Sequence, residues 1–500
     1  MFHNNQDSKM RFKLPSRKED FPAWYQAVIR EGALATQTDT PGAVVIMPHA
    51  YALWENIKHP LDQAIKATGH QNLYFPLLIP VDYFQKEEAH VKGFSKECAV
   101  VTHHRLKTTA DGKKIVPDPK AKLEIPLVVR PTSETIIWHH FSKWTQSHRD
   151  LPLLYNQWAN VVRWELRTRV FIRDREFQWQ EGHTAHATAA EAKEETLKML
   201  YLYRDVIEKK LAIPLMLGEK TAHERFAGAV ATYTIEGLMQ DGKALQMGTA
   251  HFLGQNFAKA FKVKFTNEQG AQEHAWGTSF GVTSRLIGGV IMTHGDDKGL
   301  VLPPEIAPIQ AVIIPIYKKG TAREVLLATA EKIQKNLQKV GIKVKIDDSD
   351  LQQPGWKFNA YERKGVPLRI AIGPRDLTKQ QVEVTQRDTG EKRYVPMATI
   401  VKEVQESLTK MQESLYQKAV ARIKNATHKV DDWDTFKKIL KTTRGFILAH
   451  WDGTTATEAA IQQETGATIR CIPLAQEEEE GRCIYTNKPS KRRVAFAMAY

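Results

Sequence analysis

The stretch RWELRTRVFIRDREFQWQEGH, from Arg163 to His183, is the most informative part of this chain. Its second half alternates with a period of two, which predicts a strand with one face formed by Arg173, Arg175, Phe177, Trp179, Glu181 and His183. An ordinary half-buried strand has an apolar inner face, whereas this face collects cations, aromatic rings, a carboxylate and an imidazole. Because arginine forks pair with phosphate oxygens, the set predicts a site for a phosphorylated aromatic ligand. Any single arginine could equally form a surface ion pair.

The segments around this stretch predict an α+β fold with a mostly antiparallel sheet flanked by helices. Periodicity and capping signals predict helices at 21–31, 52–68 and 188–211, strands at 43–47, 73–79, 245–252 and 288–293, and an exposed hairpin or loop at 110–122. After Pro303 and Pro304, strands at 311–317, 343–346 and 368–372 with a helix at 321–340 alternate as in βαβ units, which predicts a second, α/β domain. From about residue 400 the chain is helical and charged, and it ends in a compact segment.

Composition limits the class of protein. A chain of 500 residues predicts about three domains, and 42% hydrophobic with 26% charged residues is ordinary for a folded protein. A net charge of +14 favours a polyanionic partner only slightly. The three cysteines, Cys98, Cys471 and Cys483, indicate a reducing compartment. The polar start, Met1 to Lys9, lacks the apolar stretch of a secretory signal, and no segment is apolar enough to span a bilayer, so we expect a cytoplasmic protein.

Three motifs resemble those of the class II aminoacyl-tRNA synthetases. Arg163-x-Glu165, a loop and then Arg173-x-x-x-Phe177-x-x-x-Glu181 look like motif 2. Gly69 to Pro76 resembles motif 1, which builds a homodimer interface, and Gly281 to Arg285 resembles motif 3. The resemblance implies that Arg163 holds the α-phosphate and the amino-acid carboxylate, that Phe177 stacks on adenine, and that Arg285 covers the other side of adenine and reaches the γ-phosphate.

The sequence VRPTSETIIW, 129–138, resembles the T-x-E loop of the prolyl-tRNA synthetases. A buried carboxylate at Glu134 beside the Thr132 hydroxyl can bind the charged secondary amine of proline, while Arg163 takes the carboxylate end. Thr132 or Ser133 could instead cap the following helix. The two interpretations are compatible.

Two further segments, WQEGHTAHAT at 179–188 and QMGTAHFLGQNF at 246–257, also resemble the prolyl enzymes. The resemblance implies a proline pocket lined by Trp179, Glu181, His183 and His251, and nucleotide contacts from Gln246, Thr249 and Thr283. Each histidine could otherwise be a satisfied core residue or a metal ligand. Gly182 and Gly248 would allow a close backbone approach around a small ring.

The implied reaction activates L-proline with ATP and transfers it from prolyl-adenylate to the 3′ end of tRNA(Pro). Arg163, Arg173 and Arg285 would stabilise charge together with Mg²⁺. Glu165 or Glu176 could orient the arginines or help to hold the metal. Between motifs 2 and 3 the chain has no room for the large editing domain of some relatives, so we expect no hydrolysis of alanyl-tRNA.

The resemblance divides the chain into three domains. Residues 1–304 would form the catalytic domain, with motif 1 near 69–80, motif 2 at 163–183 and motif 3 at 281–296. Residues 305–402 would bind the anticodon, with Glu362 and Arg369 as base readers. Either residue could equally form an ion pair at a strand end.

Residues 403–500 resemble the C-terminal domain of the archaeal and eukaryotic-like enzymes, in which four cysteines bind zinc. Here Cys471 and Cys483 remain, WDGTTATE at 451–458 replaces the first pair, and Thr486 stands where the last cysteine is expected. Two thiolates do not make a tetrahedral site, so we expect zinc to be absent. The rival families are another class II synthetase, such as the threonyl enzyme, which would need zinc-binding residues in its pocket, and a catalytically silent RNA-binding relative. Against the silent relative, Arg163, Phe177 and Arg285 are all present.

Overall fold

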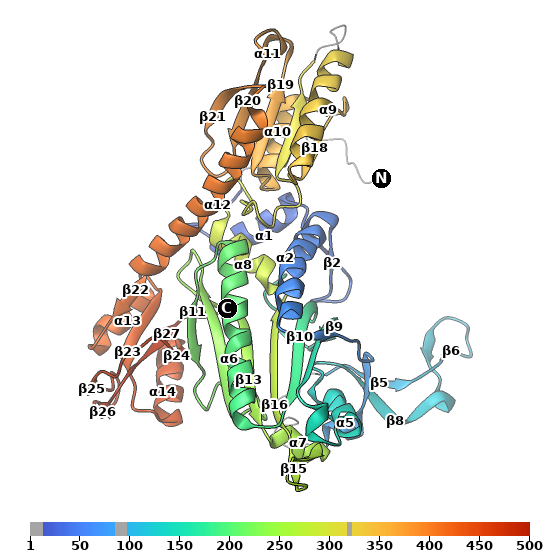
Figure 1. Ribbon diagram of the computed structural model, residues 1–500, viewed down its shortest axis with the longest axis vertical. Helices are drawn as coiled ribbons and strands as arrows, with labels where there is room; N and C mark the ends of the chain where they lie inside the picture. The colour runs from blue at the N-terminus through green and yellow to red at the C-terminus, as the bar shows by residue number, and fades with distance from the viewer. Residues whose placement is uncertain (1–13, 86–97, 318–322) are drawn as a thin grey trace.

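The computed structural model describes residues 14–85, 98–317 and 323–500, and the polar start Met1 to Lys9 lies outside them. Figure 1 shows a central body, an α/β domain at one end and a smaller C-terminal part at its side, with the long helix α12 (Ile400–Asn425) running between the last two. Among the described helices, none is both long and apolar enough to cross a membrane.

A mixed sheet organises the body. Within the described ranges it contains eleven strands in the order β22-β23-β27-β24-β11-β12-β13-β16-β10-β9-β3. Its strands from the predicted catalytic domain are β3 (Gln71–Asn72), β9 (Leu153–Val162), β10 (Glu176–His186), β11 (Met216–Glu219), β12 (Ala231–Leu238), β13 (Ala244–Gly254) and β16 (Trp276–Thr283). Neighbouring strands from β9 to β11 in this order are antiparallel, as expected, whereas β3 pairs with β9 in parallel.

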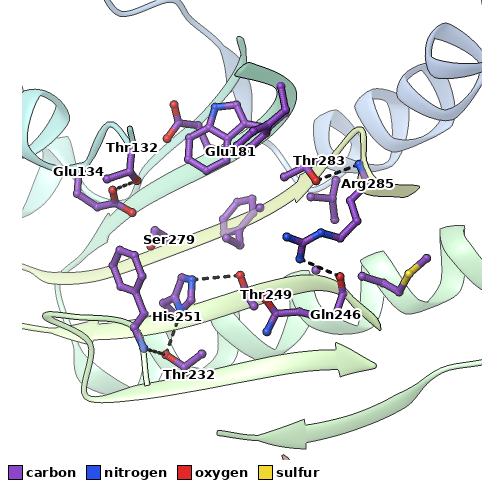
Figure 2. Close-up of a pocket in the computed structure, with 18 of the residues that line it drawn as sticks. Thr132, Glu134, Glu181, Thr232, Gln246, Thr249, His251, Ser279, Thr283 and Arg285 are labelled. Carbon is purple, nitrogen blue, oxygen red and sulfur yellow. Dashed lines mark hydrogen bonds between the residues drawn. The ribbon is translucent and has the colours of Figure 1, made fainter. Parts of the chain in front are cut away.

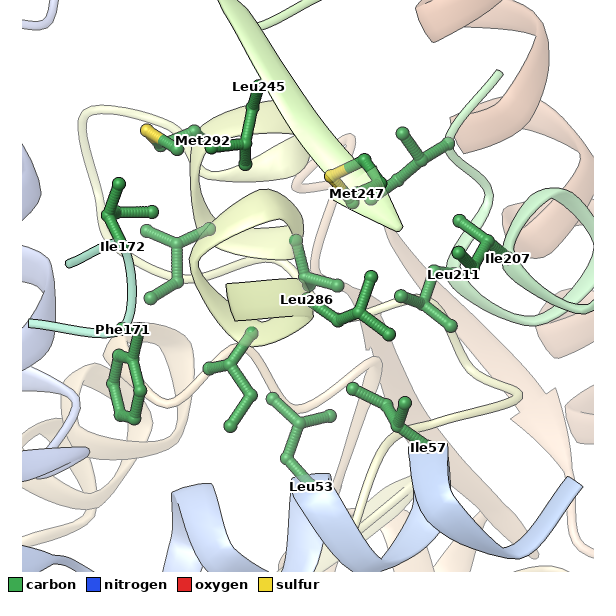
Figure 3. Packing of buried hydrophobic residues seen from close by; sticks show 14 of the residues in the cluster. Leu53, Ile57, Phe171, Ile172, Ile207, Leu211, Leu245, Met247, Leu286 and Met292 are labelled. Atoms are coloured by element: carbon green, nitrogen blue, oxygen red, sulfur yellow. The ribbon is translucent and has the colours of Figure 1, made fainter. Parts of the chain in front are cut away.

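Helices cover one face of this sheet and form the largest core. They are α1 (Phe21–Glu31), α2 (Pro48–Ala67), α6 (Ala189–Val206) with its π-helical continuation Ile207–Leu211, and α8 (Arg285–His294). Figure 3 shows Leu53 and Ile57 of α2 facing Leu286 of α8 beside Met247 of β13. The predicted helix at 21–31 is confirmed, and the Thr188 hydroxyl caps the predicted helix at 188–211 by accepting from Glu191 N.

The strand expected at 288–293 is wrong, because this segment is the buried helix α8. A short apolar run does not by itself distinguish a buried strand from a buried helix. The two glycines that weaken a helix are needed for close packing. A Cβ at Gly288 would lie 2.3 Å from Ile172 Cδ1, and one at Gly289 would lie 2.6 Å from Met247 Cε.

The strand expected at 73–79 is also wrong in its extent. β3 ends at Asn72, and β4 (Leu78–Pro80) belongs to a different sheet, in which it pairs with β8 (Lys122–Val129). The chain crosses between the two sheets at Pro76, which has no N–H for a ladder. Instead, Phe75 N donates to Gln157 Oε1 (2.5 Å). Helix α2 begins one turn earlier than expected because Pro48 is well suited to a first helical position.

Smaller elements complete the body. The hairpin or loop predicted at 110–122 is a hairpin that begins a few residues earlier, formed by β6 (Leu106–Thr108) and β7 (Ile115–Pro117), which project from the body in Figure 1. The remaining elements are β1 (Ala35–Gln37), β2 (Val44–Ile46), α3 (Val81–Phe84), β5 (Val100–His103), α5 (Glu134–Trp144), α7 (Asn256–Phe261), β14 (Lys264–Thr266) and β15 (Gln272–His274).

The α/β domain has a five-stranded sheet in the order β18-β17-β19-β20-β21 within the described residues. Strands β17 (Ala311–Pro315), β18 (Val344–Ile346) and β19 (Leu368–Ile372) are parallel, whereas β20 (Gln381–Gln386) and β21 (Lys392–Pro396) are antiparallel additions. Its helices are α9 (Arg323–Lys339), α10 (Pro354–Arg363) and α11 (Pro374–Thr378). The βαβ pattern predicted from sequence is therefore confirmed.

The C-terminal part continues the catalytic sheet instead of forming a separate one. Its elements are β22 (Thr427–Lys429), α13 (Trp433–Lys441), β23 (Phe446–His450), α14 (Thr455–Thr465), β24 (Thr468–Pro473), β25 (Gly481–Arg482), β26 (Pro489–Ser490) and β27 (Arg493–Ala497). Strand β24 pairs with β11 through Gly218↔Pro473 and Glu219↔Ile472. Gly218 is required there, because a Cβ would lie 2.4 Å from the Cβ of Cys471.

Candidate active site

A pocket opens over the centre of the sheet in the body. Figure 2 shows its walls, formed by strands β10, β13 and β16 and by the T-x-E loop before α5. The alternation of β10 is confirmed for the four side chains that lie within the strand and line the pocket: Phe177, Trp179, Glu181 and His183. The facing strands contribute Gln246, Thr249, His251, Ser279 and Thr283.

Two arginines were wrongly expected on this strand face. Strand β10 begins at Glu176, and the preceding residues form a turn in which Phe171 has φ +62°. Arg173 lies in that turn and lines a smaller cavity adjoining the pocket. Arg175 lines neither, because its Nε donates to the Glu165 carbonyl oxygen (2.9 Å) and its guanidinium lies over Trp164. The period-two pattern fails there because it holds only within a regular strand.

The T-x-E loop places a carboxylate at one end of the pocket. Glu134 is the first residue of α5 and is buried, and the Thr132 hydroxyl donates to its Oε2. Ser133 occupies the N-cap position, as the alternative interpretation expects, but its hydroxyl does not cap the helix. Instead, Ser133 Oγ donates to Glu181 Oε1 (2.5 Å), so that the loop is tied to β10.

Glu181 and His183 form a buried pair beside this carboxylate. His183 Nε2 lies 2.9 Å from Glu181 Oε2, and Gln157 Nε2 donates to Glu181 Oε1 (2.6 Å). Burial lowers the pKa of His183, but the hydrogen bond and the charges of Glu181 and Glu134 outweigh it and raise this pKa. In the part of the chain that the structure describes, no three acidic, cysteine or histidine side chains gather as a metal site would require. His183 is thus a hydrogen-bond partner of Glu181, and the carboxylates favour its protonated form.

His251 forms a neutral part of the wall. Thr232 Oγ1 lies 3.0 Å from its Nδ1, and Thr249 Oγ1 lies 3.2 Å from its Nε2. The ring of Phe226 stacks on it with centroids 4.4 Å apart. Burial lowers the pKa of His251 to about 4, so the imidazole is uncharged at neutral pH.

The opposite end of the pocket is cationic. The guanidinium of Arg163 lies 5.6 Å from the ring centroids of both Phe177 and Trp179. Arg285 is anchored by bonds from Nε to the Ile172 carbonyl (3.1 Å) and from Nη1 to the Gln246 carbonyl (3.3 Å). Burial, followed by repulsion from Arg163 and Arg173, lowers the pKa of Arg285 to about 10. Cations that destabilise one another in this way favour an anionic ligand.

The sequence patterns did not identify several residues of the site: Gln157 behind the pocket, and Glu224, Phe226, Thr232 and Ser279 in its wall. Ser133 belongs to the T-x-E loop, so a contact of its hydroxyl within the pocket could have been predicted from the sequence. Ser279 faces His183 across the β10–β16 pairing, which only the register reveals. Within the described residues, Ser279 Oγ and Trp179 Nε1 are buried without a hydrogen-bond partner, as expected where a ligand completes the bonding.

The two acidic candidates beside the arginines differ in position. Glu165 lines the smaller cavity together with Arg163 and Arg173. Glu176 lines neither cavity and accepts from Asn160 Nδ2 (2.8 Å). Of these two carboxylates, only Glu165 is placed to approach a phosphate-bound cation. This fits Mg²⁺, which takes most of its ligands from phosphate and water.

Glu362 and Arg369 lie in the α/β domain. The Arg369 guanidinium packs on the ring of Phe358 at 3.8 Å, and its Nη2 donates to Thr385 Oγ1 (2.9 Å) and lies 3.7 Å from Glu383. Glu362 Oε1 lies 3.3 Å from Lys298 Nζ. Both side chains thus have oppositely charged partners, as the ion-pair alternative expects.

Comparisons with known proteins agree with this arrangement. Family models match at residues 120–294 (tRNA synthetase class II core domain of the G, H, P, S and T type), 310–407 (anticodon binding domain) and 433–500 (prolyl-tRNA synthetase, C-terminal). A proline–tRNA ligase of Amoebophilus asiaticus is 57% identical over 98% of this chain and 100% of its own length. Those of Cytophaga hutchinsonii and Salinibacter ruber are each 54% identical over 97% of this chain and 99% of their own. The chain belongs to the proline–tRNA ligase family.

Membership confirms the class II synthetase fold and sets aside the threonyl rival. The enzyme is a ligase that uses ATP to join proline to tRNA, because this reaction defines the family. In this class Mg²⁺ accompanies ATP.

Asp174, in the turn before β10, predicts a pH dependence of stability. Its Oδ2 accepts from Phe171 N (2.8 Å), and burial raises its pKa to about 7 against the opposing effects of that bond and of Arg285. Between about pH 4 and pH 7 the unfolded carboxyl loses its proton while the folded one keeps it. Rising pH therefore costs stability by up to about 1.4 kcal/mol per unit, and the loss levels off above pH 7.

Asp174→Asn should remove this slope. In urea unfolding of the ligand-free enzyme, we expect the wild type to lose up to about 3 kcal/mol relative to Asp174→Asn between pH 4.5 and pH 7. Asp434→Asn, at an exposed carboxyl, is the matched control and should follow the wild type. Parallel curves for wild type and Asp174→Asn would show that Asp174 is ionised across this range.

Proposed function

We propose that Glu134 and Thr132 bind the secondary amine of proline and that Arg163 binds its carboxylate. The observation that carries this proposal is the polarity of one cavity, with a buried carboxylate at one end and arginines at the other. A zwitterionic amino acid matches that polarity only in one orientation. Arg163 feels the charges of Glu134, Glu181 and Glu165, which oppose the effect of burial on its pKa, so it stays charged without a substrate.

The proline ring would lie between these ends, against Trp179, His183, His251 and the Glu181 carboxylate. A neutral His251 suits an apolar ring because it adds no charge to that wall. The stacked Phe226 and the pair of threonine hydroxyls hold the imidazole in place. Size is then the main basis for discrimination, which for one methylene is worth only about 1–3 kcal/mol.

The nucleotide would occupy the cationic end. We assign Phe177 to one face of adenine and Arg285 to the other, Gln246, Thr249 and Thr283 to the ribose side, and Arg163, Arg173 and Glu165 to the phosphate side. The lowered pKa of Arg285 supports a polyphosphate, which would relieve the repulsion among these arginines. Mg²⁺ bound to ATP would neutralise further charge, and Glu165 is the residue that would approach it.

The chemistry then requires positioning and charge stabilisation, without a protein nucleophile. A carboxylate oxygen of proline attacks the α-phosphorus, the bond to the β-phosphate oxygen breaks, and pyrophosphate leaves. A terminal hydroxyl of the tRNA next attacks the prolyl carbonyl and releases AMP. Arg163, Arg173 and Arg285 stabilise the charge that develops on the phosphate oxygens.

Glu134→Gln tests the amine site. The amide keeps the shape but loses the charge, so we expect KM for proline to rise roughly 10–100-fold in ATP–pyrophosphate exchange, equivalent to about 1.5–3 kcal/mol for a hydrogen bond to a charged group. KM for ATP should stay unchanged. Glu191→Gln, in the exposed first turn of α6, is the matched control. Wild-type exchange with an amino acid other than proline, and silence with proline, would refute the assignment.

We also propose that this chain lacks cis editing of alanyl-tRNA. All residues between motif 2 and Gln246 are described, and they form α6, its π-helical end and strands β11 to β13 of the catalytic sheet. This leaves no inserted domain in that interval to hydrolyse a mischarged tRNA. Rapid deacylation of alanyl-tRNA by the purified chain would contradict the proposal.

The three-domain division is proposed with boundaries at 304/305 and 402/403. The first is supported by the family matches, which end at 294 and resume at 310. The second falls within α12, a continuous helix that would connect the anticodon-binding and C-terminal domains.

Within the anticodon-binding domain, Glu362 and Arg369 are proposed to read anticodon bases. We expect Glu362→Ala and Arg369→Ala to lower kcat/KM for tRNA about tenfold or more, since a good base contact contributes roughly 1–3 kcal/mol. ATP–pyrophosphate exchange should be unaffected, because both residues lie outside the catalytic pocket. Glu391→Ala, at an exposed turn of the same domain, serves as the control. Lost exchange in either variant would assign it a structural role instead.

The C-terminal domain is proposed to lack zinc. Where relatives carry ligands, Asp452 accepts hydrogen bonds from the hydroxyls of Thr454 (2.9 Å), Thr457 (2.8 Å) and Thr486 (2.9 Å). Burial raises the pKa of Cys471 to about 12, whereas zinc binds the thiolate. These residues do not fit a tetrahedral zinc site. Elemental analysis finding one tightly held zinc per chain would contradict this.

A cytoplasmic homodimer is the proposed state of the enzyme. The three cysteines are free, which suits a reducing compartment. On the motif 1 segment Tyr74 is 69% exposed, and Leu106 and Ile115 on the projecting hairpin are 65% and 71% exposed. Exposed apolar side chains of this kind suit a subunit interface. Sedimentation as a monomer at micromolar concentration would argue against it.

A further inference from the structure

A buried cluster of charges joins the C-terminal strands to the catalytic sheet. Glu236 on β12 is fully buried and accepts from four donor atoms. Arg470 on β24 donates to Oε2 from Nε (3.1 Å) and Nη2 (2.9 Å). Lys220 Nζ (3.2 Å) and Thr234 Oγ1 (2.9 Å) donate to Oε1. Burial raises the pKa of Glu236, but Lys220 and Arg470 outweigh it and lower the pKa, so the carboxylate is ionised and only accepts.

Thr234 connects Glu236 to the pocket through two hydrogen bonds. Its hydroxyl has one proton, which it donates to Glu236, so only its lone pairs remain for a neighbour. That neighbour is Gln246, whose Nε2 donates to Thr234 Oγ1 (3.2 Å). Because its nitrogen faces Thr234, the amide of Gln246 turns its carbonyl oxygen away from Thr234, where it can serve the pocket that Gln246 lines. Figure 2 shows Gln246 beside Arg285, far from Glu134.

We infer that Arg470 and Glu236 are positioning residues, which act through Thr234 to fix the Gln246 amide with its carbonyl oxygen toward a ribose hydroxyl of ATP. The inference rests on the proposed assignment of Gln246 to the nucleotide. An amide held in one orientation before binding loses less conformational freedom on binding, which favours affinity. The carboxylate of Glu236 has to be ionised. A protonated carboxyl could donate to Thr234 and reverse the direction of the hydrogen bonds that run from Gln246 through Thr234 to Glu236.

The series of contacts from Arg470 through Glu236 and Thr234 to Gln246, called the relay below, gives the C-terminal domain a direct role at the nucleotide end. Arg470 belongs to β24, whereas Glu236, Thr234 and Gln246 belong to β12 and β13. The same charges act on Arg285: burial is the largest cause that lowers its pKa, Glu236 opposes this effect, and Arg470 adds to it. The cluster therefore faces the nucleotide side of the pocket.

A second contact between the same domains provides a matched control. Thr221 Oγ1 donates to Glu458 Oε1 (2.9 Å), and both residues are buried. Thr221 directly follows Lys220, so this contact lies next to the cluster, but it makes no bond to Gln246. Glu458→Gln thus disturbs the same interface while leaving the relay intact.

The test is ATP–pyrophosphate exchange by the full chain, with KM measured for ATP, 2′-deoxy-ATP, 3′-deoxy-ATP and proline. Thr234→Val keeps the side-chain shape and removes the hydroxyl, so KM for ATP should rise roughly 3–10-fold, as for one lost hydrogen bond. KM for proline should stay unchanged. The rise should vanish with the deoxy analogue that lacks the hydroxyl bound by Gln246. Arg470→Lys, which keeps the charge but loses the fork, should act in the same direction, and Glu458→Gln should leave KM for ATP unchanged.

Equal rises in KM for ATP and proline, or a rise that persists with both deoxy analogues, would overturn the relay and leave a purely structural role. Thr234→Val keeps the ion cluster and the domain contact, so it remains decisive if Arg470→Lys fails to fold. Gln246→Ala distinguishes failure of the nucleotide assignment of Gln246 from failure of the relay. An unchanged KM for ATP in Gln246→Ala refutes the nucleotide assignment itself, whereas a raised KM there with an unaffected Thr234→Val refutes only the relay.

Discussion

Backbone pairing of β10 with β9 on one side and β16 on the other is the constraint on which the active site depends. Two ladders fix the pleat, so that Phe177, Trp179, Glu181 and His183 share one face. A slip of one residue would turn all four away from the pocket. The opposite face resists such a slip, because Gln180 is buried there and bonds Tyr203 Oη and Asn156 Oδ1. The hydrogen bonds of Gln180 on the opposite face thus hold the register of the strand, and with it the polar face toward the pocket.

The substrate pocket carries unfavourable electrostatics in its ligand-free form. Arginines gather at one end and repel one another, while Glu134 and the Glu181–His183 pair lie buried at the other. Such an arrangement costs folding stability, which the extensive helix-covered core offsets elsewhere. If the proposed site holds, binding of proline and ATP relieves both ends together. Stability and affinity would then be linked through the same charges.

Residues in regular elements were the most predictable from sequence. The four pocket residues of β10 follow from period-two alternation and the helix at 21–31 from its apolar spacing, because both depend on local geometry. Prediction failed for Arg175, since a turn with a strained Phe171 precedes the strand, and for 288–293, where the close contacts of Gly288 are made by distant residues. Ser279, Glu236 and Arg470 depend on which strands become neighbours. No local sequence pattern indicates which strands pair with one another.

The strand order of the C-terminal domain also has a consequence for synthesis. β27, at residues 493–497, lies between β23 and β24, so these two earlier strands are not joined until residues 493–497 have been synthesised. Until then β24, with Arg470, has a partner only in β11. If the proposed relay holds, the nucleotide end of the pocket cannot reach its final arrangement before β27 is in place. Chains that stop before β27 would then bind ATP less well than the full sequence.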